Sequence, residues 1–146
     1  KCIKLRHMKG TILVIDDNPN VLTALNQLLE PMAEELICIK SPDLIPGILE
    51  THQTDVIIMD MNFTRGVTDG SEGIMWLKRI LDIDPDSVVI MITAYSEVDL
   101  AIEAIKCGAT DFISKPWNLK STMAIKPRCL RRGLSIRRSL FLGRQP

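Results

Sequence analysis

The sequence predicts an α/β fold in which a parallel sheet of five strands is covered by helices on both faces. Between Thr11 and Lys115, short runs rich in β-branched residues alternate with segments of helical hydrophobic period. The predicted strands are almost continuously apolar, which is typical of strands buried on both sides of a parallel sheet. A chain of 146 residues has room for one domain core of ordinary size.

The first half of this region supplies three strands and two helices. Strands are predicted over residues 11–15, 36–39 and 56–59. Asn18-Pro19 opens the first helix with a cap residue and a proline. The second helix is expected to start at Ser41. The apolar residues expected on these two helices are Val21, Leu25, Leu28 and Met32, then Leu44, Ile45, Ile48 and Leu49.

The second half supplies two helices and two strands. A polar loop over residues 61–70 precedes the third helix, and strands are predicted over residues 88–92 and 111–114. The segment from Ser96 to Asp99 fits a capping box for the fourth helix, which Gly108 ends. The apolar residues expected on these two helices are Ile74, Leu77, Ile80 and Leu81, then Val98, Ala101, Ile102 and Ile105.

The composition excludes several classes of protein. Hydrophobic residues make up 46% of the chain and charged residues 25%, as in soluble globular domains. No apolar run approaches the ~20 residues that span a bilayer, and no secretory signal opens the chain. The four cysteines form no CxxC pair, so free thiols are expected. These features together predict a cytoplasmic protein without membrane contact.

The net charge of zero hides a division of the chain. Residues 1–119 carry ten Lys/Arg and all eighteen Asp/Glu, whereas residues 120–146 carry eight Lys/Arg and no acid. We expect a vector-derived leader over residues 1–8 and one folded domain over residues 9–119. The basic segment 120–146 is expected to be either a divergent fifth helix, interrupted by Pro127, or disordered.

Polar side chains follow four of the five predicted strands, at the point where each strand ends. Asp16 and Asp17 follow the first strand, Asp60 ends the third, Thr93 follows the fourth and Lys115 follows the fifth. Open parallel sheets bind their ligands at this edge, so the five residues are expected to converge. A lone Asp at a strand end is usually a turn or cap residue, but the joint occurrence favours a functional site.

This set of side chains suits phosphoryl transfer to a carboxylate. Three neighbouring carboxylates repel one another, and a divalent cation with oxygen ligands, most simply Mg²⁺, removes that cost. Lys115 would bring a positive charge to a phosphate oxygen, and Thr93 a hydroxyl donor. The metal ion and the lysine would together hold the oxygens of the phosphoryl group.

Four segments carry a resemblance to a known family. VIDDN (14–18), VIIMD (56–60), ITA (92–94) and DFISKP (111–116) are similar to the signature stretches of response-regulator receiver domains of bacterial two-component systems. The resemblance covers residues 11–118 and implies a doubly wound, flavodoxin-like fold with strand order 2-1-3-4-5. It also implies Asp60 as phosphoacceptor, with Mg²⁺ or Mn²⁺ held by Asp16, Asp17, Asp60 and the backbone carbonyl of Asn62.

The resemblance assigns further roles at the same edge of the sheet. Thr93, Ala94 and Lys115 would bind the phosphoryl group, Phe112 would change rotamer with them, and Pro116 would follow a cis peptide bond. A sensor histidine kinase would be the phosphodonor, and the chain would catalyse its own phosphorylation and slow dephosphorylation without being an enzyme for an outside substrate. The output would be the regulation of transcription.

The long loop over residues 61–73 resembles receivers of bacterial enhancer-binding transcription activators. A downstream effector domain, absent from this chain, is therefore an expected partner. A missing fifth helix would leave part of the first helix and of the fifth strand uncovered, so a homodimer is a further expected partner. Nucleic-acid binding is not expected of the receiver itself.

Two rival functions start from the same residues. Residues 120–146 have the charge to bind nucleic acid or a protein, although they contain no helix-turn-helix pattern and no interleaved aromatics. An aspartate-nucleophile phosphatase of the haloacid-dehalogenase type needs a second Asp two positions after the nucleophile. Asn62 occupies that position here and cannot carry the proton, so the phosphatase is the less favoured rival.

Overall fold

The computed structural model describes residues 10–94 and 98–115. Helices and strands alternate along these residues. In chain order they are β1 (Thr11–Ile15), α1 (Pro19–Leu29), η1 (Glu30–Met32), β2 (Glu35–Ile39), η2 (Pro42–Leu44), α2 (Ile45–Thr51), β3 (Val56–Asp60), α3 (Ser71–Ile83), β4 (Val89–Ala94), α4 (Val98–Lys106) and β5 (Asp111–Lys115).

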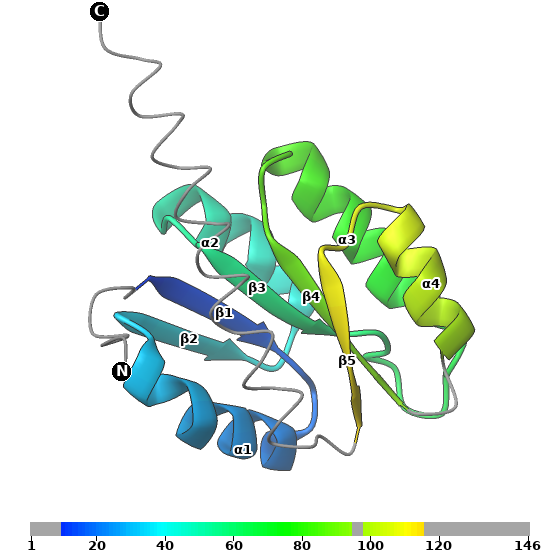
Figure 1. Ribbon diagram of the computed structural model, residues 1–146, viewed down its shortest axis with the longest axis horizontal. Coiled ribbons are helices and arrows are strands. Elements are labelled where there is room, and N and C mark those ends of the chain that lie inside the picture. Colours follow the sequence, from blue (N-terminus) through cyan, green and yellow to red (C-terminus); the bar gives the residue numbers. More distant parts are fainter. Residues whose placement is uncertain (1–9, 95–97, 116–146) are drawn as a thin grey trace, which may run out of the picture.

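All five strands run parallel in one sheet, in the order β2-β1-β3-β4-β5. Helix α1 lies on one side of the sheet, and α2, α3 and α4 lie on the other (Figure 1). The predicted flavodoxin-like strand order is therefore confirmed. The order reverses between β1 and β3, and in such sheets the crevice at that reversal is the usual place for a ligand.

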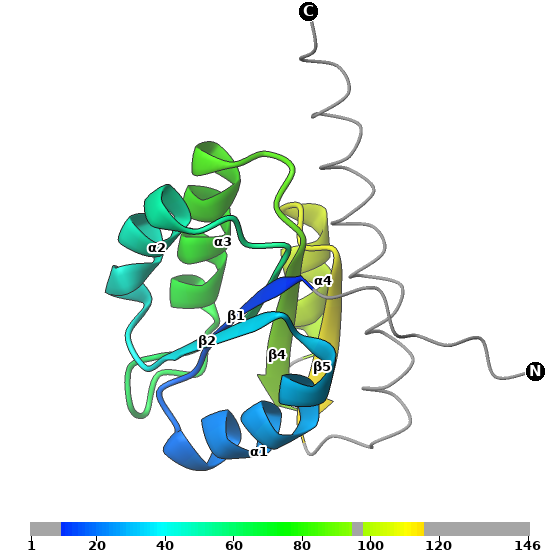
Figure 2. The ribbon, with the colours of Figure 1, turned by 90° about the vertical axis from the view of Figure 1, so that its left-hand side faces the viewer.

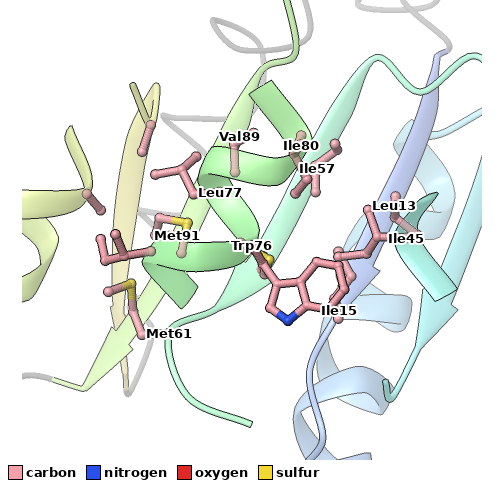
Figure 3. Packing of buried hydrophobic residues seen from close by; sticks show 14 residues of the cluster. Leu13, Ile15, Ile45, Ile57, Met61, Trp76, Leu77, Ile80, Val89 and Met91 are labelled. Atoms are coloured by element: carbon pink, nitrogen blue, oxygen red, sulfur yellow. The ribbon is translucent and has the colours of Figure 1, made fainter. Parts of the chain in front are cut away.

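Two hydrophobic clusters fill the two faces of the sheet. One packs Leu22, Leu25 and Leu29 of α1 against the strands. The other packs α2, α3 and α4 against the opposite face, with Leu77 and Ile80 of α3 over Met91 and Ile57 (Figure 3). Figure 2 shows α2 and α3 side by side on this face. Each fully buried aliphatic side chain contributes roughly 1.5–3 kcal/mol to folding. The packed core therefore holds the five strands, and with them the residues at the strand ends, in fixed positions.

Helix α4 faces the sheet differently from the prediction. Its buried residues are Ala101 and Ala104, whereas Val98, Ile102 and Ile105 are 45%, 47% and 40% exposed. Only Ala101 of the predicted face is correct. The large aliphatic residues share a stripe in the sequence, but α4 turns Ala101 and Ala104 toward the sheet, and of its large residues Leu100 packs, partly buried, against the core.

The buried residues of the first two helices also differ from the prediction. In α1 the buried residues are Leu22, Leu25 and Leu29. Of the predicted residues, Leu25 is buried and Val21 is partly buried against the same cluster, whereas Leu22 and Leu29 were not predicted. The second helical segment is divided, because Ser41 caps the short helix η2 and α2 starts only at Ile45. Leu44 lies at this junction and is 55% exposed.

Four predictions fall on residues outside those described. They concern the leader over residues 1–8, the capping box that starts at Ser96, the basic segment 120–146 and the peptide bond before Pro116, and all four remain predictions. Within residues 10–94 and 98–115, the helices are too short or too polar to cross a bilayer.

Gly73 of α3 lies close to the backbone of the chain after β3. A Cβ atom at this position would lie 2.6 Å from the backbone oxygen of Met61. We expect Gly73→Ala to lower the free energy of unfolding by about 1–3 kcal/mol, because either α3 or the backbone after Asp60 must move. Urea unfolding of the variant beside the wild type measures this change.

Gly47 in α2 supplies the matched control. No atom lies within 4 Å of the place where its Cβ would stand. We expect Gly47→Ala to raise the free energy of unfolding by about 0.5–1 kcal/mol, since alanine loses less backbone entropy in a helix. Equal stabilities of the two variants would contradict the close contact at Gly73.

Candidate phosphorylation and metal site

Asp16 and Asp17 follow β1 and differ in exposure. The backbone N–H of Asp16 donates to the carbonyl of Ile39, which extends the pairing with β2 by one residue. The Asp16 side chain is completely buried, and its Oδ1 accepts the N–H of Asn18 at 2.8 Å. Asp17 is exposed. The turn between β1 and α1 therefore fixes one carboxylate inside the crevice and leaves its neighbour at the rim.

Asp60 ends β3 in the middle of the sheet. It pairs in register with Ile92 of β4, and the next residue, Met61, donates its N–H to the carbonyl of Ile92. Asp60 is 9% exposed. Carboxylate oxygens of Asp16, Asp17 and Asp60 lie within 4.8 Å of one another, as the convergence of strand ends predicted.

Lys115 is the cation that faces this acidic group. Its Nζ lies 3.3 Å from Asp16 Oδ2 and 3.3 Å from Asp60 Oδ1. Lys115 pairs in register with Ala94, so the small side chain of Ala94 lies at the same level of the sheet. The lysine thus bridges carboxylates from two strands that are not neighbours of its own.

Thr93 and Phe112 lie on β4 and β5 with different environments. Thr93 is 1% exposed, and its Oγ1 has no hydrogen-bond partner among the described residues. A buried hydroxyl without a partner carries a desolvation cost that a ligand oxygen would remove. Phe112 is partly buried and packs against the cluster formed by α2, α3 and α4.

Burial dominates the protonation of the crevice. Burial, helped by the neighbouring charge of Asp16, raises the pKa of Asp60 to about 6. Burial also raises the pKa of Asp16, against the opposing effects of the Asn18 N–H and Lys115. For Lys115 burial alone would lower the pKa, but the charges of Asp60 and Asp16 outweigh it and the pKa is raised.

The residues present fit a hard divalent cation. Three carboxylates within 4.8 Å are the oxygen ligands that Mg²⁺ prefers, and the exposed position of Asp17 leaves one side open to water. One lysine cannot neutralise all three carboxylates. Burial is the main cause of the raised pKa values of Asp16 and Asp60, and the repulsion between neighbouring carboxylates adds to it.

The loop after Asp60 contains polar contacts that the sequence did not predict. Asn62 was expected to contribute its backbone carbonyl, and its side-chain Oδ1 in addition accepts the N–H of Gly70 at 2.8 Å. Glu72 accepts the N–H of Thr64 at 2.8 Å and that of Phe63 at 3.3 Å. An acid in the first turn of a helix is common for other reasons, so the sequence carried no signal for this contact.

Comparison with known proteins identifies a family model that matches the chain. The model is described as response regulator receiver domain, and it matches residues 12–125. The N-terminal signal receiver domain of a two-component response regulator from Bacteroides fragilis is 36% identical, with a TM-score of 0.76. That similarity covers 84% of this chain and 97% of the solved chain.

Curated relatives include longer regulators. The regulatory protein AtoC of Escherichia coli is 31% identical over 82% of this chain but only 25% of its own length. The heme response regulator HssR of Staphylococcus saprophyticus is 32% identical over 91% of this chain and 57% of its own length. The DNA-binding transcriptional regulator NtrC of Klebsiella pneumoniae is 26% identical over 84% of this chain and 25% of its own length. The chain thus spans between a quarter and about half of these relatives, and the predicted resemblance to receivers of transcription activators is confirmed.

The raised pKa of Asp60 predicts how stability depends on pH in metal-free buffer. Between the ordinary value of 3.8 and about 6, the folded protein keeps a proton that the unfolded chain has released. The resulting stabilisation is complete below pH 3.8 and is lost as the pH rises through about 6. Asp60→Asn removes this dependence, so above pH 7 the variant should be more stable than wild type by up to about 3 kcal/mol.

Urea unfolding from pH 4 to pH 8 with EDTA measures the difference between the two proteins. Asp82→Asn, which removes an exposed carboxylate from α3, is the control and should follow the wild type throughout. A difference between Asp60→Asn and wild type that stays constant from pH 4 to pH 8 would contradict the raised pKa.

Proposed function

The chain belongs to the response regulator receiver domain family, and from this premise we propose that it is a phosphorylation switch whose acceptor is Asp60. The observation that carries the proposal is the meeting of three carboxylates, Lys115 and an unpartnered hydroxyl, that of Thr93, at the ends of four strands. A cytoplasmic sensor histidine kinase is the proposed phosphodonor, and regulation of transcription is the proposed output.

In the proposed reaction a carboxylate oxygen of Asp60 attacks the phosphorus of a phosphohistidine in line with the leaving nitrogen. The new bond is P–O, the broken bond is P–N, and the electron pair leaves with the imidazole. The reaction needs the ionised form of Asp60. Burial raises the pKa of Asp60 to about 6 in the protein without a cation, and a bound cation would favour the ionised form. Lys115 Nζ, now shared between Asp16 and Asp60, would donate to one phosphoryl oxygen and Thr93 Oγ1 to another.

Mg²⁺ or Mn²⁺ is the proposed cofactor. Asp16, Asp17 and Asp60 would hold it together with the backbone carbonyl of Asn62, Asp16 acting mainly through water. When bound, the cation neutralises the carboxylates and the charge on the incoming phosphoryl group. The completely buried Asp16 and the Lys115 bridge keep the acceptor oxygen of Asp60 oriented while the phosphoryl group arrives.

The output would pass through β4, β5 and α4. Thr93 and Lys115 would move toward the phosphoryl group, and Phe112 would change rotamer with them. Helix α4 begins four residues after Ala94 and exposes Val98, Ile102 and Ile105. A change in the position of α4 would therefore alter an apolar surface available to an effector domain or to a second copy of the chain.

The phosphatase alternative finds little support at the position that it requires. A general acid two residues after Asp60 would be Asn62, whose side-chain oxygen accepts the N–H of Gly70. An amide in this role holds the loop and cannot transfer a proton. The other alternative, binding through residues 120–146, concerns residues outside those described.

Phosphorylation is tested by the mass of the intact protein after incubation with Mg²⁺ and acetyl phosphate or phosphoramidate. The wild type should gain one phosphoryl group in Mg²⁺ and none in EDTA. Asp60→Asn should gain none, because its amide is not a nucleophile, while its circular dichroism stays that of the wild type. An equal adduct on Asp60→Asn would show that the acceptor lies elsewhere. No adduct on the folded wild type would contradict the proposed switch.

Lys115→Ala should separate phosphorylation from its output. The variant keeps the acceptor and should still gain a phosphoryl group, but without the Nζ contact β5 has no link to the new charge. Amide hydrogen exchange of α4 should therefore change on phosphorylation in the wild type and stay unchanged in Lys115→Ala. The control is Lys78→Ala, which removes an exposed lysine from α3. A variant whose α4 responds like the wild type would refute this role of Lys115.

A further inference from the structure

The loop between β3 and α3 is closed by hydrogen bonds between its two ends. Gly73 donates its N–H to the carbonyl of Met61 at 2.9 Å. Gly70 donates its N–H to Oδ1 of Asn62 at 2.8 Å. Both bonds tie the residues that directly follow Asp60 to the start of α3. The ten residues between β3 and α3 therefore leave and return to nearly the same place.

The side chain of Glu72 in α3 forms a further connection to the loop, here as the hydrogen-bond acceptor. Glu72 is the second residue of α3, half-buried, and its Oε1 accepts the N–H of Thr64 at 2.8 Å and that of Phe63 at 3.3 Å. Hydrogen bonds to an ionised acceptor are stronger than bonds between neutral groups. Phe63 is itself partly buried against the core, so its side chain and its N–H are both held.

Asn62, which lies between these hydrogen-bonded residues, is the residue whose backbone carbonyl is proposed to bind a cation. Asn62 lies between Met61, bound through its carbonyl, and Phe63, bound through its N–H. Two anchored neighbours leave the peptide plane between Asn62 and Phe63 little freedom. A ligand fixed before the cation arrives binds it more tightly than one that must first be ordered.

We propose that Glu72 is a positioning residue that fixes the backbone of Asn62 for cation binding at Asp16, Asp17 and Asp60. It touches neither the cation nor the phosphoryl group and acts only through the N–H groups of Phe63 and Thr64. This inference rests on the proposed function, because it assigns the Asn62 carbonyl to the metal site. The loop between β3 and α3 would thus contribute to cation binding in addition to the residues at the strand ends.

Three substitutions separate the hydrogen bonds from the charge of Glu72. Glu72→Ala removes both. Glu72→Gln removes the charge but keeps an oxygen at the same reach, whereas Glu72→Asp keeps the charge and shortens the reach. Glu103→Ala, which removes an exposed carboxylate from α4, controls for a general change in surface charge. Circular dichroism and urea unfolding establish that each variant is folded.

Titration calorimetry with MgCl₂ gives the dissociation constant for each protein. We expect Glu72→Ala and Glu72→Asp to bind Mg²⁺ about 10- to 100-fold more weakly than wild type, as is usual when a group that orients a ligand is lost. Glu72→Gln should recover most of the affinity, and Glu103→Ala should equal the wild type. In the metal-free state, the amides of Phe63 and Thr64 should lose protection from hydrogen exchange in the Ala and Asp variants only.

The outcomes distinguish this inference from the proposed function. If the wild type binds Mg²⁺ and Glu72→Ala binds it equally well, the positioning role is wrong and the switch stands. If Gln weakens binding as much as Ala while Asp does not, the effect is one of charge and the positioning role is again wrong. If the wild type binds no Mg²⁺, both proposals fail. Should Glu72→Ala not fold, the Gln and Asp variants decide the question without it.

Discussion

The crowding of negative charge at the ends of β1 and β3 is the constraint on which the rest of the site depends. Three carboxylates share a space of 4.8 Å, and one lysine from β5 faces two of them. Such an arrangement is costly in isolation, because burial and the repulsion between carboxylates both disfavour the ionised form, and both contribute to the raised pKa values of Asp16 and Asp60. It persists because buried strands on both sides hold the carboxylates in place. The site therefore has an excess of negative charge, which a bound cation can neutralise.

The sheet can carry these charges because its buried apolar residues lie within the strands, whereas the charged residues lie at the strand ends. Leu13, Ile15, Ile57 and Met59 are almost completely buried, and they fix β1 and β3 beside each other up to the residues that carry the charges. The polar side chains begin only where the strands end. Core packing and site chemistry therefore occupy different parts of the same strands, and the packing free energy of the first offsets the electrostatic cost of the second.

The sequence alone predicted the strand order through its family resemblance, and the convergence of Asp16, Asp17, Asp60 and Lys115 through the position of each at a strand end. The strand order and the convergence were both predictable because the signature motifs and the polar residues recur at the ends of successive strands. The inward face of α4 could not be predicted in this way, since helical spacing selected Ile102 and Ile105 while the approach of the helix to the sheet selected Ala101 and Ala104. The Glu72 contacts escaped for another reason: they join residues eight and nine positions apart across an irregular loop.

The two buried alanines of α4 affect which surface residues of the domain can change during evolution. Ala101 and Ala104 satisfy the contact with the sheet, so Val98, Ile102 and Ile105 are left without a buried role. None of these three residues belongs to either hydrophobic cluster or to the acidic group. The proposed recognition surface and the acidic centre can therefore evolve independently. One sheet could acquire new recipients for its signal while its chemistry stayed the same.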